Sequence, residues 1–238
     1  MLGIFFGCTT RSDEKLSGNL KELLKKAGVE YKALGVELCC GAPLVLAGHR
    51  DAAINQAKKV EKEIEDAGVD EIATPCPHCF TMLGKEYEEL LGHKLPVKVM
   101  HITQLIDRLI ADGKLKLTKE IKVKISYHDP CYIGRQSGGI YDEPRRIVKS
   151  IPGVEYIEPE LSRENATCCG GGGLLRAYLP NLAVQVAAEK IEMQLKPIGA
   201  EAVVSSCPFC YTNFADGAEI AKDFKVYDLI ELVLMAAE

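Results

Sequence analysis

Several features that mark large classes of protein are missing from this sequence. Its 238 residues carry a formal net charge of −5, so no basic excess indicates a nucleic-acid partner. No apolar run approaches the ~20 residues that a membrane-spanning helix needs. The apolar start, residues 1–6, lacks the basic segment and the length of a signal peptide. We therefore expect a globular, cytoplasmic protein with no transmembrane segment of its own, whether free or peripheral to a membrane complex.

Ten cysteines stand out among what is present, and they follow one pattern twice. A single cysteine is followed by Cys-Cys-Gly and then by Cys-Pro-X-Cys. The first set is Cys8, Cys39, Cys40, Cys76 and Cys79, and the second set is Cys131, Cys168, Cys169, Cys207 and Cys210. In a reducing compartment, clustered cysteines indicate metal or redox chemistry rather than structural disulfides. Ten soft ligands in a repeated order predict two metal sites, and iron–sulfur clusters are the first choice.

The duplication extends beyond the cysteines and predicts the fold. In each half, short apolar runs alternate with helical patterns, which indicates an α/β protein made of two duplicated Rossmann-like domains, each a parallel sheet with helices on both faces. Strands are expected at 2–6, 29–36, 69–74, 97–100, 123–127, 154–157, 202–205 and 225–227. Helices are expected around 16–24, 53–64, 101–110, 144–150, 174–195, 208–221 and 229–237. The polar stretch 112–120 acts as the linker between a first domain at 1–115 and a second at 121–238.

The cysteines fall where predicted strands end, which is where ligands collect in such a sheet. Cys76 and Cys207 are each followed by proline, a residue suited to the first helical position. A helix N-terminus lowers the pKa of a thiol and offsets the charge of an anionic cluster. Gly41 and the run 170–173 leave room for backbone to approach inorganic sulfide. The run lacks the order GxxxxGK[ST], which argues against a nucleotide loop.

Five cysteines per set is one more than a cubane 4Fe-4S cluster or a tetrahedral zinc ion needs. Either one cysteine in each set is spare, or the cluster is larger and more open, with a sulfur that bridges two irons. We favour the second, because the surplus occurs in both copies. Taken alone, Cys76-Pro-His-Cys79 would indicate a thioredoxin-like redox pair, which would leave six cysteines unexplained.

The segments 127–135, 141–145 and 164–173, together with the complete cysteine pattern, resemble the cysteine-rich CCG domain. That domain occurs twice in the catalytic subunit of heterodisulfide reductase and in related iron–sulfur subunits. The resemblance implies two noncubane 4Fe-4S clusters, each held by the five cysteines of one set, that face each other across a disulfide substrate. It also implies a disulfide reductase of the CoM-S-S-CoB type, with no catalytic residue beyond the cluster ligands. The chain has no ferredoxin-like CxxCxxC motif, so electrons are expected from an iron–sulfur or flavin subunit of the same complex.

Two rival functions stay open beside this one. The chain could transfer electrons without catalysis, as the iron–sulfur subunit of a lactate, glycolate or glycerol-3-phosphate flavin oxidoreductase, or it could hold clusters only for structure. A substrate-sized cavity lined with basic groups would favour disulfide reduction, and a flat surface near one cluster would favour electron transfer. The other candidates are His78 as a hydrogen-bond donor, His128 as a residue that orients its loop, and Arg135, Arg163 and Arg176 as groups that neutralise charge. His49, His93 and His101 are expected at the surface or at helix caps.

Overall fold

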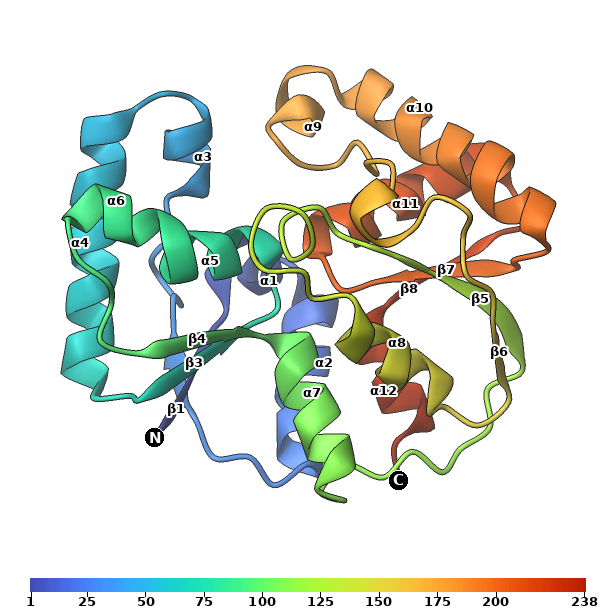
Figure 1. Ribbon diagram of the computed structural model, residues 1–238, viewed down its shortest axis with the longest axis horizontal. Coiled ribbons are helices and arrows are strands. Elements are labelled where there is room, and N and C mark those ends of the chain that lie inside the picture. Colours follow the sequence, from blue (N-terminus) through green and yellow to red (C-terminus); the bar gives the residue numbers. More distant parts are fainter.

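The computed structural model describes residues 1–238 as two four-stranded parallel sheets surrounded by helices (Figure 1). The first sheet has the order β2-β1-β3-β4, and the second has the equivalent order β6-β5-β7-β8. The strands are β1 (Leu2–Phe5), β2 (Lys32–Leu34), β3 (Glu71–Thr74), β4 (Lys98–His101), β5 (Val123–His128), β6 (Val154–Tyr156), β7 (Ala202–Ser205) and β8 (Lys225–Asp228). The predicted α/β class and the duplicated parallel sheets are confirmed. The predicted domain limits, 1–115 and 121–238, stay a prediction.

Matching elements follow each other along both halves of the chain. The helices of the first half are α1 (Gly7–Ser12), α2 (Glu14–Lys26), α3 (Ala42–Leu46), α4 (Arg50–Ala67), α5 (Pro77–Thr81), α6 (Tyr87–Leu91) and α7 (Ile102–Ala111). Those of the second half are α8 (Asp142–Lys149), α9 (Leu175–Tyr178), α10 (Pro180–Lys190), α11 (Pro208–Ala221) and α12 (Leu229–Ala236). Single π-helical turns follow α5 at Met82–Glu86 and α10 at Ile191–Leu195. None of these helices combines the length and the apolar character needed to cross a membrane.

A shared core joins the two sheets. Helices α2 and α7 cover one face of the first sheet, and α8 and α12 cover one face of the second. Figure 1 shows these four helices between the sheets, where α2 contacts α12 and α7 contacts α8. Their buried side chains, such as Leu20, Ile106, Ile147 and Leu232, belong to one apolar cluster of 27 residues that draws on both halves. The remaining face of each sheet has its own smaller core, beneath α4 to α6 and beneath α10 and α11. Burial on both faces explains the apolar composition of the strands.

One predicted helix differs from the structure in its continuity. The expected helix at 174–195 begins instead as α9, breaks at Leu179, and restarts as α10 with Pro180 at its first position. Proline lacks an amide donor and its ring clashes with the preceding turn, so it begins a helix more readily than it continues one. The break turns α9 away from the axis of α10 and places it across from α3 (Figure 1).

Candidate metal centres

Strand ends position the cysteines of both sets. Cys8 lies in α1 directly after β1, and Cys131 lies in the loop after β5. Cys76 and Cys207 are the N-cap residues of α5 and α11, with Pro77 and Pro208 at the first helical position, as the sequence predicts. Since parallel strands end at the same edge of a sheet, each half gathers its sulfur atoms at one edge.

The first set converges beside α5. The Sγ atoms of Cys8 and Cys39 lie 3.6 Å apart, and the backbone amide of Gly41 donates to Cys39 Sγ over 3.5 Å. The buried hydroxyl of Tyr87 donates to the carbonyl of Cys40 (3.0 Å), which fixes the double-cysteine loop against the π-helical segment and α6. The first set is therefore held by backbone and side-chain contacts from several elements.

The second set converges beside α11. The Sγ atoms of Cys169 and Cys210 lie 3.0 Å apart. The backbone amides of Gly170 and Gly171 donate to Cys168 Sγ and Cys169 Sγ, each over 3.3 Å. Such donors stabilise thiolates and tune cluster potentials. All ten cysteines of the chain are free thiols.

Neighbouring thiols strongly perturb one another's pKa values within both sets. Contact with the Cys39 thiol raises the pKa of Cys8, whereas contacts with Cys39 and Cys79 lower the pKa of Cys40 to about 5. In the second set, contact with Cys168 raises the pKa of Cys169 to about 12. Neighbouring thiols thus divide protons among themselves, because like charges in a buried site repel. Bound iron would remove this conflict, since it takes every coordinating thiol as thiolate.

The empty space beside the two sets differs in size. All five cysteines of the second set line one small space of about 20 Å³, which has room for little more than a water molecule. Cys8, Cys40, Cys76 and Cys79 line a larger cavity of about 280 Å³. Convergent soft sulfur donors and amide donors aimed at sulfur fit an iron–sulfur group at both sets. When bound, such a group supplies one-electron redox chemistry, and the cysteines of the adjoining set would hold it.

The larger cavity lies between the two halves of the molecule. Its far wall consists of Gly171 to Leu174, Arg176 and Phe209, all from the second half. His78 also lines it, with its ring centroid 3.8 Å from that of Tyr132 and 5.2 Å from that of Phe209. The residues between the paired cysteines of each half, His78 and Phe209, therefore meet at this interface. His78 Nδ1 is buried and has no hydrogen-bond partner.

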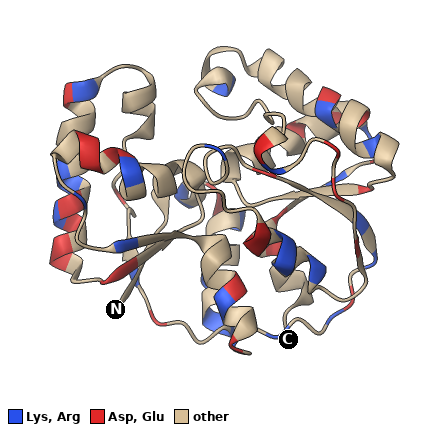
Figure 2. Cartoon of the chain, viewed as in Figure 1, with Lys and Arg blue, Asp and Glu red and all other residues tan.

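The cavity wall is mostly uncharged. Arg176 is its only lysine or arginine, and this guanidinium donates to Asn213 Oδ1 (2.8 Å) and pairs with Asp216. Asn213 in turn donates to the carbonyl of Cys169 over 2.7 Å. Figure 2 shows mixed charges along α4 and α10, whereas α3 at the rim of the cavity carries none. The basic lining that would favour disulfide reduction is therefore absent, and Arg176 is linked to the second set only through Asn213.

The remaining candidate residues divide into loop supports and caps. Arg135 donates to the carbonyls of Glu164 (3.0 Å) and Ala166 (2.6 Å) and so ties the Cys131 loop to the segment before Cys168. Arg163 pairs with Asp142 at the surface. His49 and His101 are N-cap residues of α4 and α7, as expected, and His93 pairs with Glu61 at the surface.

His128 lies closer to the sulfurs than the sequence indicates. A ring nitrogen lies within 4.8 Å of both Cys169 Sγ and Cys210 Sγ, and Nδ1 has no hydrogen-bond partner. Burial lowers the pKa of this imidazole well below its ordinary value, so it is neutral and able to accept a hydrogen bond or a metal ion. Its ring therefore stands at the second set itself, and the expectation that it orients its loop stays a prediction.

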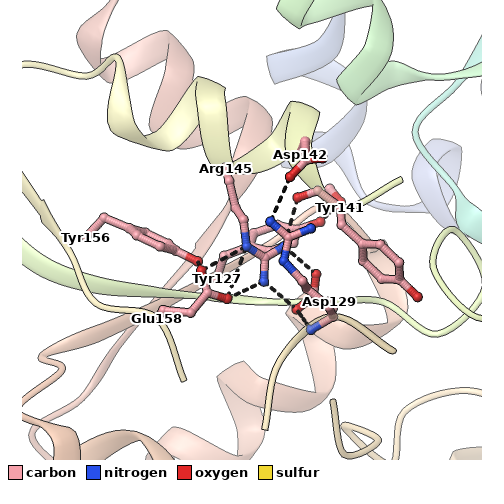
Figure 3. A network of polar contacts seen from close by, with 9 residues as sticks. Tyr127, Asp129, Tyr141, Asp142, Arg145, Tyr156 and Glu158 are labelled. Carbon is pink, nitrogen blue, oxygen red and sulfur yellow. Dashed lines mark hydrogen bonds and ion pairs between the residues drawn. The ribbon is translucent and has the colours of Figure 1, made fainter. Parts of the chain in front are cut away.

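Two supporting residues were not singled out from the sequence. Arg145 pairs with both Asp129 and Glu158 beneath the Cys131 loop (Figure 3). Lys190 lies buried on α10 and donates to the carbonyl of Thr167 (2.8 Å), next to Cys168. A signal for Lys190 exists in the sequence, since this lysine interrupts the apolar stripe that Ala183 and Ala187 begin.

Comparison with known proteins agrees with this geometry. The chain is 36% identical over 238 residues to a subunit of dihydromethanophenazine:CoB–CoM heterodisulfide reductase from Methanosarcina barkeri, covering 98% of this chain and 58% of that protein. It is 34% identical to the EtfAB:quinone oxidoreductase of Syntrophomonas wolfei, covering 99% and 34%. It is 31% identical to a subunit of fumarate reductase (CoM/CoB) from Methanothermobacter marburgensis, covering 99% and 46%. The chain thus spans between a third and three fifths of the length of these relatives.

The family model for the CCG cysteine-rich domain matches the chain twice, at residues 2–84 and 125–215. Each match contains one complete five-cysteine set and the strands that position it. On these two matches, the chain belongs to the CCG cysteine-rich domain family.

Proposed function

We propose that this chain is the catalytic iron–sulfur subunit of a heterodisulfide-reductase-like complex and reduces a disulfide at two noncubane 4Fe-4S clusters. The five cysteines of the first set would ligate one cluster and the five of the second set the other. An iron–sulfur role in an oxidoreductase is supported at the family level, because relatives that match nearly the whole chain are oxidoreductases or their subunits. The type of cluster and the disulfide reaction are the finer parts of the proposal.

One observation carries the proposal: both sets converge at the same interface, with a partly open cavity beside the first. Cavity walls come from both halves, so a small molecule there would contact groups next to both sets. Gly172 stands against His78, and a side-chain carbon at that glycine would lie only 3.3 Å from His78 Cε1. The interface is therefore tight, and it would exclude water from a bound substrate.

The protein's own residues have defined tasks in such a reaction. Cleavage of a disulfide takes two electrons and two protons and yields two thiols. The electrons would arrive one at a time through the two sets. His78 lines the cavity, so its imidazole would contact a substrate whose sulfur becomes negative as the bond breaks. The glycines 171–173 form a wall without side chains, which lets a substrate approach both sets.

The uncharged wall bears on the nature of the substrate. An anionic disulfide of the CoM-S-S-CoB type would find only Arg176 in this cavity, and Asp216 already neutralises that residue. The chain alone therefore offers no strong anion site there. Partner segments would have to supply further cations, or the natural disulfide carries less charge. The relatives exceed this chain in length, which leaves both possibilities consistent with the proposal.

The same observation favours a second candidate, a non-catalytic electron-transfer subunit of a flavin-linked oxidoreductase. Such a subunit needs no cation in its cavity, and the EtfAB:quinone oxidoreductase of Syntrophomonas wolfei covers nearly the whole chain. In this case electrons would pass through both sets from one partner to another, and no small molecule would be reduced on this chain.

A disulfide assay separates the two candidates. The protein is purified without oxygen, its iron and sulfide are measured, and reduced viologen dye is offered as electron donor with a panel of anionic and neutral disulfides. Disulfide-dependent oxidation of the dye, together with a new paramagnetic signal when a product thiol is added to the oxidised protein, supports catalysis. Iron-loaded protein that exchanges electrons with the dye but gives neither result favours electron transfer alone.

A further inference from the structure

The two halves differ in charge at one matched position beside the cysteine sets. A side-chain carbon at Gly41 would lie 3.4 Å from Gln56 Cγ on α4, and one at Gly170 would lie 3.0 Å from Val186 Cβ on α10. These glycines follow the double cysteines of the two sets, so position 56 of α4 matches position 186 of α10. Four residues further along each helix, the first half has Val60 and the second has Lys190. Both are buried, with 0% and 5% of the side chain exposed.

Lys190 is a buried cation without an acidic partner. Its Nζ donates to the carbonyl of Thr167 over 2.8 Å and forms no ion pair. The nearby carboxylate of Asp129 is occupied by Arg145, which binds it through two nitrogens at 2.7 and 2.8 Å. No lysine or arginine of residues 1–115 is fully buried. At the first set, the carbonyl that precedes the double cysteine, that of Leu38, accepts instead from the half-buried guanidinium of Arg11 (2.9 Å), which also donates to the carbonyl of Gly35 (2.8 Å).

A buried ammonium without a counter-charge is unfavourable, and the protein normally compensates it. The anionic groups available here are the thiolates of the second set. Burial lowers the pKa of Lys190 to about 8, while Cys169, Cys210 and Cys168 act in the opposite direction. An anionic group held by the second set would therefore keep Lys190 charged, and the lysine would in turn stabilise negative charge at that set.

We propose that Lys190 raises the reduction potential of the centre at the second set. The inference rests on the proposed binding of an iron–sulfur group by each set. One-electron reduction adds one negative charge to a centre, with no bond formed or broken. A fixed cation beside one centre stabilises its reduced form more than its oxidised form, and local charge is an established control on such potentials. Lys190 thus changes the potential at which the second centre accepts an electron, and it does not ligate that centre.

Redox titration followed by electron paramagnetic resonance tests the proposal. The full chain is prepared anaerobically in two backgrounds: one in which Cys76→Ala and Cys79→Ala disable the first set, and one in which Cys207→Ala and Cys210→Ala disable the second. Lys190→Gln is introduced into both, because glutamine keeps a donor for Thr167 and removes the charge. Lys190→Arg keeps the charge, and Val60→Met is the matched uncharged control on the first side.

The expected result is specific to one centre. Lys190→Gln lowers the midpoint potential of the second centre by about 59 mV, which corresponds to a tenfold change in the equilibrium constant for one-electron reduction. Lys190→Arg restores most of that potential, and neither Lys190→Gln in the other background nor Val60→Met shifts the first centre in the same way. No shift of the second centre with Lys190→Gln would overturn the inference while leaving the proposed clusters in place. Absence of iron and sulfide from the unmodified chain would overturn the proposed function itself.

Discussion

Replacing Arg145 with methionine would test what holds the second cysteine set in place. This guanidinium binds Asp129 through two nitrogens, at 2.7 and 2.8 Å, and also contacts Glu158 and the carbonyl of Tyr141 (Figure 3). Arg145 and Asp129 are both buried, at 3% and 4% exposure. Asp129 lies two residues before Cys131, so the network fixes the loop that presents this cysteine.

The expected cost is large because the partner cannot move into water. Without Arg145, the buried carboxylate of Asp129 keeps the backbone amide of Arg163, at 2.8 Å, as its donor. Removing one member of a buried ion pair destabilises a protein by about 3–5 kcal/mol. At a urea slope of about 3 kcal/mol per molar, the unfolding midpoint should fall by roughly 1–2 M.

Arg146 provides the matched control. It is the next residue on the same helix, it also pairs with an aspartate, Asp107, and its side chain is 57% exposed. Exposed ion pairs contribute about 0–1 kcal/mol, so Arg146→Met should move the midpoint by less than about 0.4 M. Urea unfolding of both anaerobically purified variants, followed by circular dichroism, gives the comparison, and iron analysis should show loss for Arg145→Met alone. Equal midpoints for the two variants would refute the claim that this buried pair supports the Cys131 loop.

Three further perturbations follow from the structure. Gly171→Ala should remove most iron from the second set, because the new side-chain carbon would lie 2.5 Å from the carbonyl oxygen of Phe209. Gly18→Ala is the control, because its new carbon lies on the exposed face of α2 and meets nothing within 4 Å. This variant should keep its iron and raise the free energy of unfolding by about 0.5–1 kcal/mol. Alanine at both cysteines of either Cys-Pro-X-Cys pair should halve iron and sulfide per chain, and loss of all iron from one such double variant would contradict independent sites. Burial raises the pKa of Asp228 to about 7. The contribution of this group to stability is therefore fully present below the unfolded pKa of ~3.9 and is lost as the pH rises through 7. Asp228→Asn should raise the melting temperature more at pH 8 than at pH 4, and the reverse order would contradict the raised pKa.

Local patterns were sufficient to predict the strands and the location of the cysteines at the ends of those strands. The central strands β3 and β7 are short apolar runs that end before Cys-Pro, and the proline marks the start of the following helix. These features depend on a few neighbouring residues, so they can be read without knowledge of the tertiary structure. The break at Pro180 was also readable, but the apolar pattern on either side of it outweighed the proline in the prediction.

Contacts between distant segments could not be predicted in the same way. The cavity wall combines His78 with Gly172 and Arg176, about a hundred residues further along the chain, and no local pattern indicates that they meet. Whether Arg176 is free to bind an anion depends on Asp216, which lies on another helix. The sequence therefore predicted a site between the halves, through its resemblance to a known family. Only the structure shows that the wall of this site contains no free cation.

Duplication explains the common geometry of the two sets, and divergence of the second half explains their unequal surroundings. Both halves have the same strand order, yet the buried aspartates, lysine and arginine (Asp129, Arg145, Lys190 and Asp228) all belong to the second. If Lys190 raises the potential of the second centre, that centre holds an added electron more tightly than it would without the lysine. The large cavity lies against the first set. A substrate bound there would lie beside the first centre, so an electron held at the second centre would have to cross the interface to reach it, and the potential that Lys190 sets would control how readily that electron leaves.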